Sequence, residues 1–341
     1  MQNKIKIIPT MAIYNSFAQY EEVMRLFSEE NIDMIRINMT RFEPARYIYE
    51  IVSMRETYKK IAPNLKLKIL LDIPLPGKKP RVYFNGKESK KKIYNGEKVT
   101  LTFQKECVDV EKNIFAVDDC EFIAYLCVKK SKYVYFDDGK LKCQVIDIND
   151  DFVETIAQND GVISFCKSVY ADGYYFSPVT DVFFEKYLDA INAIKPEYIA
   201  LSFVENASDV KKIKNSLMAP IKIVSKIETP CGANNIDDIV KISDAIMIGR
   251  GDLAITSGIA LFCKIHDKLL EYSNYIDVYV ATDILQSVVE NEFPNRADLI
   301  DVNKLIVSNV KGLITSGRTA RGFSLKRFKR VVDMIKGEYH L

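Results

Sequence analysis

The sequence predicts an α/β protein: a (β/α)8 TIM barrel with a small all-β domain inserted after the third barrel strand. First, short apolar runs rich in β-branched residues alternate with longer runs whose apolar residues recur at helical spacing. This alternation is typical of parallel strands joined by right-handed crossovers. Second, the chain contains eight such strand–helix pairs, the number that closes a barrel. Third, one long stretch, 77–178, interrupts the alternation and carries a different pattern.

The elements of the barrel follow from these patterns. The predicted strands are short and apolar, and they cover residues 4–12, 33–39, 66–73, 198–203, 221–227, 245–249, 277–282 and 312–315. The predicted helices have an apolar stripe at helical spacing, and they cover residues 16–30, 44–61, 181–194, 207–217, 236–242, 259–272, 297–310 and 324–336. The barrel, with the active site, is therefore expected to comprise residues 1–76 and 179–341.

The interrupting stretch, 77–178, is predicted to form a β-rich domain. The runs VTLTF at 99–103 and YVYF at 133–136 have the composition of strands. Asn-Gly pairs at 85–86 and 95–96, and Asp-Gly at 138–139, are typical of hairpin turns. Because the stretch lies between the third strand and the third helix, we expect it to be inserted in a barrel loop.

Composition excludes several classes of function. The 341 residues include 48 Lys and Arg against 46 Asp and Glu, and the net charge of +2 predicts no nucleic-acid or membrane partner. The start of the chain lacks a targeting signal, and no apolar run approaches the length of a membrane span. Seven cysteines without C-x-x-C spacing are typical of reduced thiols in a cytoplasmic protein. With only two histidines, the chemistry is expected to depend on Lys, Arg, Asp, Glu and hydroxyl groups.

Polar and ionisable residues recur where the predicted strands end. In a (β/α)8 barrel the carboxyl ends of the strands carry the catalytic groups, and they meet at one rim. Burying several charges together is costly without a role, so we expect these residues to form a site. They are Arg36, Asn38, Thr40, Asp72, Lys226, Glu228, Asp252 and Thr282.

The types of these residues indicate what binds. Glu228 and Asp252 supply hard oxygen ligands without histidine, which suits Mg²⁺ or Mn²⁺. Lys226 and Arg36 supply positive charge for a phosphoryl group or an enolate. Glycines on both sides of Arg250 let backbone N–H groups approach an anion closely. Phosphoryl transfer fits this set because it needs positioning and charge neutralisation more than covalent chemistry.

Several segments have the order and spacing of one known family. The most specific is AIMIGRGDL at 245–253. The others are DMIRIN at 33–38, LLD at 70–72, DDG at 137–139, YIALSFV at 198–204, SKIE at 225–228, NID at 235–237, AT at 281–282 and SGRTARG at 316–322. With these segments the chain resembles the pyruvate kinase family through nearly the whole barrel.

The resemblance implies Mg²⁺-dependent transfer of a phosphoryl group from phosphoenolpyruvate to a nucleoside diphosphate (ADP), giving pyruvate and ATP. It implies that Glu228 and Asp252 hold the divalent metal. It also implies that Lys226 stabilises the enolate oxygen, that Arg36 binds the phosphoryl group, and that the backbone of Gly251 and Asp252 receives the substrate carboxylate. The domain at 77–178 would close over the nucleotide as a lid.

The resemblance also implies a proton donor and a monovalent cation site. Thr282 would lie near the methylene carbon and help deliver the proton that completes pyruvate. Asn38, Thr40 and Asp72 match positions where the family holds K⁺. Ile73 lies where the family has a threonine and has no side-chain oxygen, so the K⁺ dependence of this chain stays open.

Other departures concern the nucleotide and the assembly. Arg41 stands in place of the family's histidine, in a segment that the resemblance sets toward the nucleotide, so the acceptor stays open. Arg318 stands where the family has Glu. The sequence ends just after the eighth predicted helix, where the family continues into a C-terminal domain. We therefore do not expect the family's usual tetramer, and a homo-oligomer of another form stays open.

Two other functions remain compatible with the residues. One is a metal-dependent aldolase or lyase acting on a pyruvate enolate, with the same metal pair and no nucleotide. The other is a catalytically degenerate protein that binds phosphoenolpyruvate or a similar anion without turnover. The inserted domain argues against the lyase, whereas the altered segment after Asp72 keeps the non-catalytic reading open.

Overall fold

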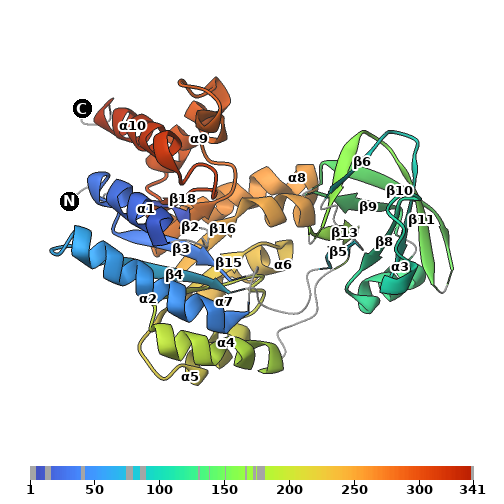
Figure 1. Cartoon of the computed structure of the whole chain (residues 1–341), viewed down its shortest axis with the longest axis horizontal. Helices are drawn as coiled ribbons and strands as arrows, with labels where there is room; N and C mark the ends of the chain where they lie inside the picture. Colours follow the sequence, from blue (N-terminus) through green and yellow to red (C-terminus); the bar gives the residue numbers. More distant parts are fainter. Residues whose placement is uncertain are drawn as a thin grey trace. The chain divides into compact units, whose positions relative to one another are not determined.

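The computed structural model describes residues 5–11, 17–39, 43–73, 80–84, 90–129, 131–137, 139–149, 151–165, 167–171, 174 and 181–338. The chain divides into two compact units (Figure 1). The first comprises Met1–Leu75 and Asp181–Leu341, and the second comprises Pro76–Thr180.

The first unit contains the barrel sheet, and its strands are parallel, as the alternation predicts. In the described part of the chain this sheet has nine strands in the order β1-β18-β17-β16-β15-β14-β4-β3-β2. The strands are β1 (Lys6–Ile8), β2 (Thr10–Met11), β3 (Met34–Asn38), β4 (Lys68–Ile73), β14 (Tyr198–Leu201), β15 (Lys222–Ile227), β16 (Ala245–Gly249), β17 (Asp277–Ala281) and β18 (Gly312–Ile314).

The sheet closes through the predicted first strand, which is split at Pro9 into β1 and β2. β1 pairs with β18, and β2 pairs with β3, so the two ends of the strand order come from one short segment. Proline has no N–H to donate, but its carbonyl accepts a hydrogen bond from Arg36 N at 2.9 Å. With eight strand positions around a closed parallel sheet, the predicted (β/α)8 barrel is confirmed.

Helices cover the outside of the barrel (Figure 1). They are α1 (Phe17–Glu29), α2 (Pro44–Ile61), α4 (Asp181–Ile194), α5 (Ala207–Ser216), α6 (Pro230–Asn234), α7 (Ile236–Val240), α8 (Arg250–Glu271), α9 (Arg296–Val307) and α10 (Gly322–Glu338). Short 3₁₀ turns occur at η2 (Tyr272–Asn274) and η3 (Gln286–Val289). None of the helices in the described residues is long and apolar enough to span a lipid bilayer.

Two α-helical segments of the first unit were not predicted. α8 begins directly after β16, at Arg250, and Gly258 with a φ of 68° separates its first turns from the predicted helix at 259–272. In the sequence, Gly258 indicates the end of a helix. The turns that precede it are too short to show a helical pattern of their own, so they were not predicted. α6 is also additional, and the Thr229 side chain caps it by accepting a hydrogen bond from Gly232 N at 3.1 Å.

The inside of the barrel changes from apolar to charged along the strands. Buried side chains near the amino ends include Met34, Leu70, Ala200 and Val224. Because strand side chains alternate, the residues two positions further along point to the same interior. Those residues are Arg36, Asp72, Ser202 and Lys226. The fold therefore brings the polar strand ends together above an apolar core.

The second unit is built mainly from strands. They are β5 (Val82–Tyr83), β6 (Lys90–Ile93), β7 (Lys98–Thr102), β8 (Ile114–Val117), β9 (Tyr133–Phe136), β10 (Leu141–Ile148), β11 (Phe152–Ala157), β12 (Gly161–Ser164) and β13 (Val169–Ala171). A seven-stranded sheet has the order β13-β9-β10-β11-β7-β8-β5, and β12 pairs with β6. A 3₁₀ turn, η1 (Lys105–Cys107), follows β7.

The second unit also contains a helix, α3 (Cys120–Lys129), so the expectation of an all-β insertion needs correction. Asp119 Oδ1 accepts a hydrogen bond from Phe122 N at 3.3 Å and so caps the helix start. Phe122, Ile123 and Leu126 have helical spacing and are buried in the core of this unit. The hairpin signals on both sides obscured this short amphipathic segment.

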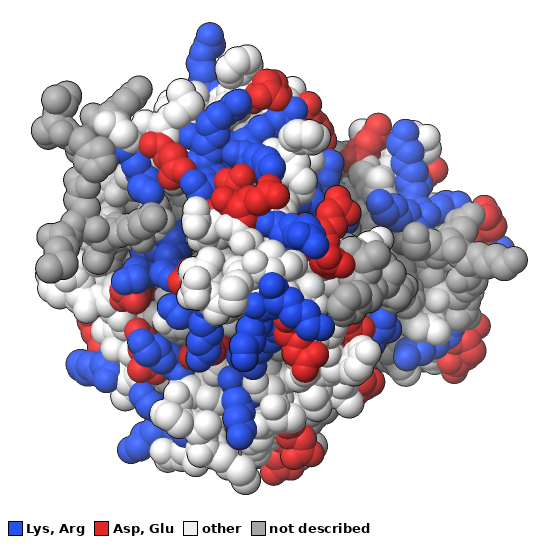
Figure 2. Space-filling model, turned by 60° about the vertical axis from the view of Figure 1, so that its left-hand side comes forward, with Lys and Arg blue, Asp and Glu red and all other residues white. Residues whose placement is uncertain are grey.

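The surface carries charges of both signs. Figure 2 shows Lys and Arg side chains lying beside Asp and Glu side chains over much of the face in view. This distribution agrees with the near balance of 48 basic and 46 acidic residues.

Candidate active site

Four charged side chains meet inside the barrel near the carboxyl ends of its strands. We call Arg36, Asp72, Lys226 and Glu228 the carboxyl-end cluster. Lys226 Nζ lies 3.2 Å from Asp72 Oδ1 and 3.1 Å from Glu228 Oε1. Arg36 Nη2 lies 2.5 Å from Asp72 Oδ2, and Arg36 Nε donates to the same oxygen at 2.8 Å. The strand order brings these side chains close together. Asp72 of β4 pairs with Asn38 of β3 on one side and with Ala200 of β14 on the other, while Arg36 lies on β3 and Lys226 lies on β15, next to β14.

Lys226 is the centre of this cluster. The residue is only 8% exposed, and its Nζ also donates to Ser202 Oγ at 2.9 Å. Burial alone would lower the pKa of Lys226, but the carboxylates of Asp72 and Glu228 outweigh burial and raise it above its ordinary value. Lys226 therefore carries a fixed positive charge in a site with little water, where its field acts most strongly.

Asp72 holds the positively charged side chains of Arg36 and Lys226 in place. The residue is 2% exposed, and burial would raise the pKa of its carboxyl group. The positive charges of Lys226 and Arg36, with their hydrogen bonds, outweigh that effect and hold the pKa of Asp72 below its ordinary value. Asp72 is consequently ionised and fixes the positions of both cationic groups.

Glu228 is less well compensated than Asp72. Its Oε2 accepts a hydrogen bond from Phe203 N at 2.9 Å, and its Oε1 is close to Lys226. Burial, supported by the charges of Asp252 and Asp72, still raises the pKa of Glu228 despite the opposing effect of Lys226. The charged form of Glu228 would therefore be stabilised by an additional cation nearby.

Gly249 provides the space that the Glu228 side chain occupies. A Cβ atom at position 249 would lie 2.6 Å from Glu228 Oε1 and 2.6 Å from its Cγ. Both distances are far below van der Waals contact, so any larger residue would displace the carboxylate. The glycine at the end of β16 is thus part of the site geometry.

The first turn of α8 forms the other side of the candidate site. Gly251 and Asp252 lie in this turn, and a Cβ atom at Gly251 would be 3.1 Å from Thr282 Cγ2 and 3.6 Å from Thr282 Oγ1. Thr282 follows β17 and is exposed at the rim. The Thr282 hydroxyl and the start of α8 are therefore direct neighbours.

The chain matches known proteins along nearly its whole length. The family model described as pyruvate kinase, barrel domain, matches residues 2–325. The chain is 30% identical over 318 residues to the pyruvate kinase of Thermotoga maritima, a match that covers 89% of this chain and 64% of that protein. It is 25% identical over 332 residues to the pyruvate kinase of Pyrobaculum aerophilum, covering 94% of this chain and 68% of that protein.

The chain belongs to the pyruvate kinase family. A third relative, the pyruvate kinase of Mycoplasma pneumoniae, is 28% identical over 318 residues, with 90% of this chain and 61% of that protein covered. The chain thus spans between 61% and 68% of the length of these curated relatives.

Of the three residues predicted for a monovalent cation, the structure describes Asn38 and Asp72. The Asn38 side chain lies beside Asp72 in the register of β3 and β4, and the Asn38 carbonyl accepts a hydrogen bond from Tyr47 at 3.1 Å. Thr40 lies outside the described residues. The Ile73 side chain is fully buried, and its carbonyl accepts a hydrogen bond from Ser202 Oγ at 3.0 Å. At this position the chain therefore departs from the pattern that the pyruvate kinase resemblance implies.

Two residues that contact the site, Ser202 and Thr10, were not predicted. Ser202 bonds to Lys226 and to the Ile73 carbonyl, and Thr10 Oγ1 accepts a hydrogen bond from Arg36 Nη1 at 3.0 Å. Ser202 has a recognisable signal, because it lies two positions after the inward-facing Ala200. Thr10 has no such signal. The direction of its side chain depends on the break of the first strand at Pro9, which the sequence pattern did not predict.

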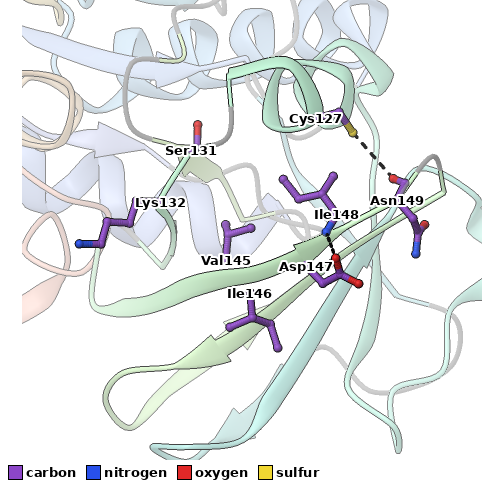
Figure 3. A pocket seen from close by; sticks show the side chains of 8 residues that line it. All are labelled: Cys127, Ser131, Lys132, Val145, Ile146, Asp147, Ile148 and Asn149. Carbon is purple, nitrogen blue, oxygen red and sulfur yellow. Dashed lines mark hydrogen bonds between the residues drawn. The ribbon is translucent and has the colours of Figure 1, made fainter.

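The second unit has a hollow of its own, with a volume of about 800 Å³ (Figure 3). It lies beside the end of α3 and the second half of β10. The lining residues are Cys127, Ser131, Lys132, Val145, Ile146, Asp147, Ile148 and Asn149. None of them is a predicted site residue, and Asp147 already accepts a hydrogen bond from Ile148 N at 2.9 Å.

Proposed function

We propose that this protein transfers the phosphoryl group of phosphoenolpyruvate to ADP in an Mg²⁺-dependent reaction that gives pyruvate and ATP. The observation that carries the proposal is the buried Lys226, held between Asp72 and Glu228 with Arg36 on the same carboxylate. Membership of the pyruvate kinase family supports the same reaction class.

Charge accounts for the roles of the two cationic residues. In the reaction the bond between phosphorus and the enol oxygen breaks, and a β-phosphate oxygen of ADP forms the new bond to phosphorus. Negative charge then develops on the enolate oxygen, which Lys226 stabilises from a fixed position. Arg36 would bind the phosphoryl oxygens with guanidinium N–H groups other than those that it directs to Asp72 and Thr10.

The donor set fits a divalent cation such as Mg²⁺ or Mn²⁺. Glu228 and Asp252 would hold it, and burial together with Asp252 raises the pKa of Glu228, a state that a cation would relieve. Among the described residues no group of three or more His, Cys, Asp and Glu could hold a metal, so substrate oxygens and water would complete the coordination. When bound, the cation supplies further neutralisation of the phosphoryl and carboxylate charges.

The last step makes the methyl group of pyruvate. The enolate regains its carbonyl as its C3 carbon takes up a proton, and the hydroxyl of Thr282 passes that proton on and is reprotonated by water. The backbone at Gly251 and Asp252 would receive the substrate carboxylate, beside Thr282. Because Ile73 has no side-chain oxygen, Asn38, Thr40 and Asp72 form an incomplete set of ligands for K⁺. We therefore expect little or no activation by K⁺.

A coupled assay with phosphoenolpyruvate, Mg²⁺ and a series of nucleoside diphosphates tests the proposal. Pyruvate that forms only with a diphosphate supports it. Cleavage of a carbon–carbon bond in a keto acid would instead indicate a lyase. Tight binding of phosphoenolpyruvate without turnover would indicate a non-catalytic anion-binding protein, and either of these results would refute the kinase activity.

A further inference from the structure

Arg250 connects three segments of the barrel. Its Nε donates to the Thr282 carbonyl at 2.9 Å, and its Nη2 donates to the same carbonyl at 2.6 Å and to the Asp283 carbonyl at 2.8 Å. Its Nη1 pairs with both carboxylate oxygens of Asp301 on α9, at 2.7 and 2.8 Å. These five contacts engage every nitrogen of a guanidinium group, and the side chain is only 11% exposed. We call Arg250 and Asp301 the Arg250 clamp.

The clamp holds a loop whose backbone is unfavourable. Thr282, Asp283 and Leu285 have φ angles of 79°, 53° and 47°. This region is uncommon for residues other than glycine, and for the β-branched Thr282 it is a clear outlier. Each such residue is energetically costly and persists only when its surroundings fix it. Three hydrogen bonds from one planar group to two consecutive carbonyls supply that restraint.

The held loop carries a functional group of the proposed reaction. The Thr282 side chain lies against Gly251, the residue that follows Arg250 in the first turn of α8. Arg250 is thus covalently joined to the segment that would receive the substrate carboxylate, and it is hydrogen-bonded to the loop that carries the hydroxyl. One side chain therefore sets the spacing between the two.

We infer that Arg250, fixed by Asp301, is a positioning residue that orients Thr282 for proton transfer to the enolate. The inference rests on the proposed function. In the step concerned, C3 of the enolate forms a C–H bond with the proton of the Thr282 hydroxyl, the electron pair of the enolate restores the carbonyl, and water returns a proton to Thr282. The hydrogen bonds of the clamp go to the carbonyls of Thr282 and Asp283 and to the Asp301 carboxylate, so we expect its loss to slow proton transfer more than it weakens phosphoenolpyruvate binding.

The amino end of the barrel offers a matched control. Arg55 also pairs with a carboxylate, Glu197, at 2.9 Å, and donates to the carbonyls of Ile194 and Lys195 at 2.6 and 3.3 Å. Lys195 has a φ of 47°. Arg55→Lys therefore removes a similar restraint on a left-handed residue, far along the strands from Thr282. Its effect measures the structural cost of losing such a contact.

The test compares Arg250→Lys, Asp301→Asn, Thr282→Val and Arg55→Lys with the wild-type protein. Two steady-state constants, kcat and KM for phosphoenolpyruvate, are measured. Exchange of the pyruvate methyl protons is followed separately by NMR in D₂O with Mg²⁺ and ATP, because this exchange reports the enolate step. Arg250→Lys keeps the charge but not the planar fork. We expect it to slow methyl exchange and kcat about 10- to 100-fold with KM changed less than about 3-fold, as a displaced group does.

Comparison of these variants separates a positioning role of Arg250 from a purely structural one. Asp301→Asn should slow exchange in the same direction but less, and adding Arg250→Lys to Thr282→Val should have little further effect. Amide hydrogen exchange over 282–289 should rise in Arg250→Lys and not in Arg55→Lys. Wild-type methyl exchange in Arg250→Lys, or an equal loss in Arg55→Lys, overturns the positioning role alone. A wild-type protein that neither makes pyruvate nor exchanges its protons overturns the proposed function, and with it the catalytic consequence of the clamp.

Discussion

Both ends of the barrel carry ion pairs, but the pairs differ in burial and in compensation. At the amino end, Lys6 and Lys68 lie 2.6 and 3.4 Å from Asp33, and Arg55 and Lys66 each lie 2.9 Å from Glu197. We call these six residues the amino-end cluster. The Asp33 side chain is 38% exposed, whereas that of Asp72 in the carboxyl-end cluster is 2% exposed. Exposed pairs contribute little stability and cost little, whereas buried charges are expensive to desolvate.

Compensation separates the two ends further. Burial would raise the pKa values of Asp33 and Glu197, but both are lowered: Lys6 and Lys68 outweigh burial at Asp33, and the hydrogen bond from Ile69 N together with Lys66 and Arg55 outweighs it at Glu197. The pKa of Glu228 stays raised, because the carboxylates of Asp252 and Asp72 add to the effect of burial. The amino-end cluster is therefore complete in itself, and the carboxyl-end cluster retains a capacity for an added cation. This difference supports our proposal that the carboxyl-end cluster is functional and the amino-end cluster structural.

The largest expected effect comes from removing the central lysine. Lys226→Met should lower turnover about 10³-fold or more, because the enolate loses its fixed positive charge. Glu228 should then bind a proton more readily, which limits the cost to folding. Turnover and a thermal melt check both points. Lys6→Met at the amino end is the control and should leave turnover unchanged; near-normal turnover in Lys226→Met would exclude the assigned role.

The second effect concerns the metal. Glu228→Ala removes one of two carboxylates, so we expect loss of Mg²⁺-dependent turnover and Mn²⁺ affinity weakened about 10- to 100-fold or more, by analogy with the loss of metal-site residues. Mn²⁺ binding followed by electron paramagnetic resonance measures this without turnover. Glu197→Ala, from the amino-end cluster, should bind Mn²⁺ like the wild type. An unchanged metal requirement in Glu228→Ala would mean that the metal binds elsewhere.

A third variant changes the shape of the site rather than its charge. Gly249→Ala adds a Cβ atom 2.6 Å from the Glu228 carboxylate and should displace it, with turnover lowered about 10- to 100-fold. Gly337→Ala on α10 is the matched control, because no atom lies within 4 Å of the added Cβ atom. Kinetics of both variants at saturating Mg²⁺ provide the measurement. Equal turnover in Gly249→Ala and Gly337→Ala would show that turnover does not depend on the position of the Glu228 carboxylate.

The smallest effect belongs to the amino-end cluster. Glu197→Gln should lower the free energy of unfolding by about 1–2 kcal/mol at pH 7, because hydrogen bonds to a charged group are weakened. Since the folded-state pKa of Glu197 is lowered, this stabilisation is present above the ordinary carboxyl pKa and is lost as pH falls through the folded-state pKa. Denaturation of both proteins at a series of pH values from 7 downwards should therefore show a difference that shrinks in acid, with turnover at pH 7 retained.

Much of the barrel could be predicted from the sequence because period and composition report burial directly. α2, α4 and β16 have the predicted bounds. The missed parts share a physical cause: α3, α6 and the first turns of α8 are short, and Gly258 or neighbouring turn signals dominate their pattern. In short segments, capping and tertiary contacts decide the structure more than periodicity does.

The candidate site was predictable where strand alternation alone fixes direction. Arg36, Asp72 and Lys226 lie in regular strands and Glu228 directly follows one, and the structure brings them together. The contacts made by Arg250 could not be predicted, because they depend on the left-handed backbone at Thr282 and Asp283. No pattern in the sequence specifies that backbone for residues other than glycine.

The split at Pro9 has a consequence for how the molecule is made. Ile8 pairs with Ile314 across the seam where β1 meets β18, so the earliest and latest strands of the sheet are neighbours. During synthesis the ribosome delivers β1 long before its partner exists. Until β18 emerges, β1 and β17 each present an unpaired row of backbone groups to other chains. Because closing so long a loop is entropically costly, we expect pairing of β1 with β18 to be a late step of folding, with both edges open to other chains until then.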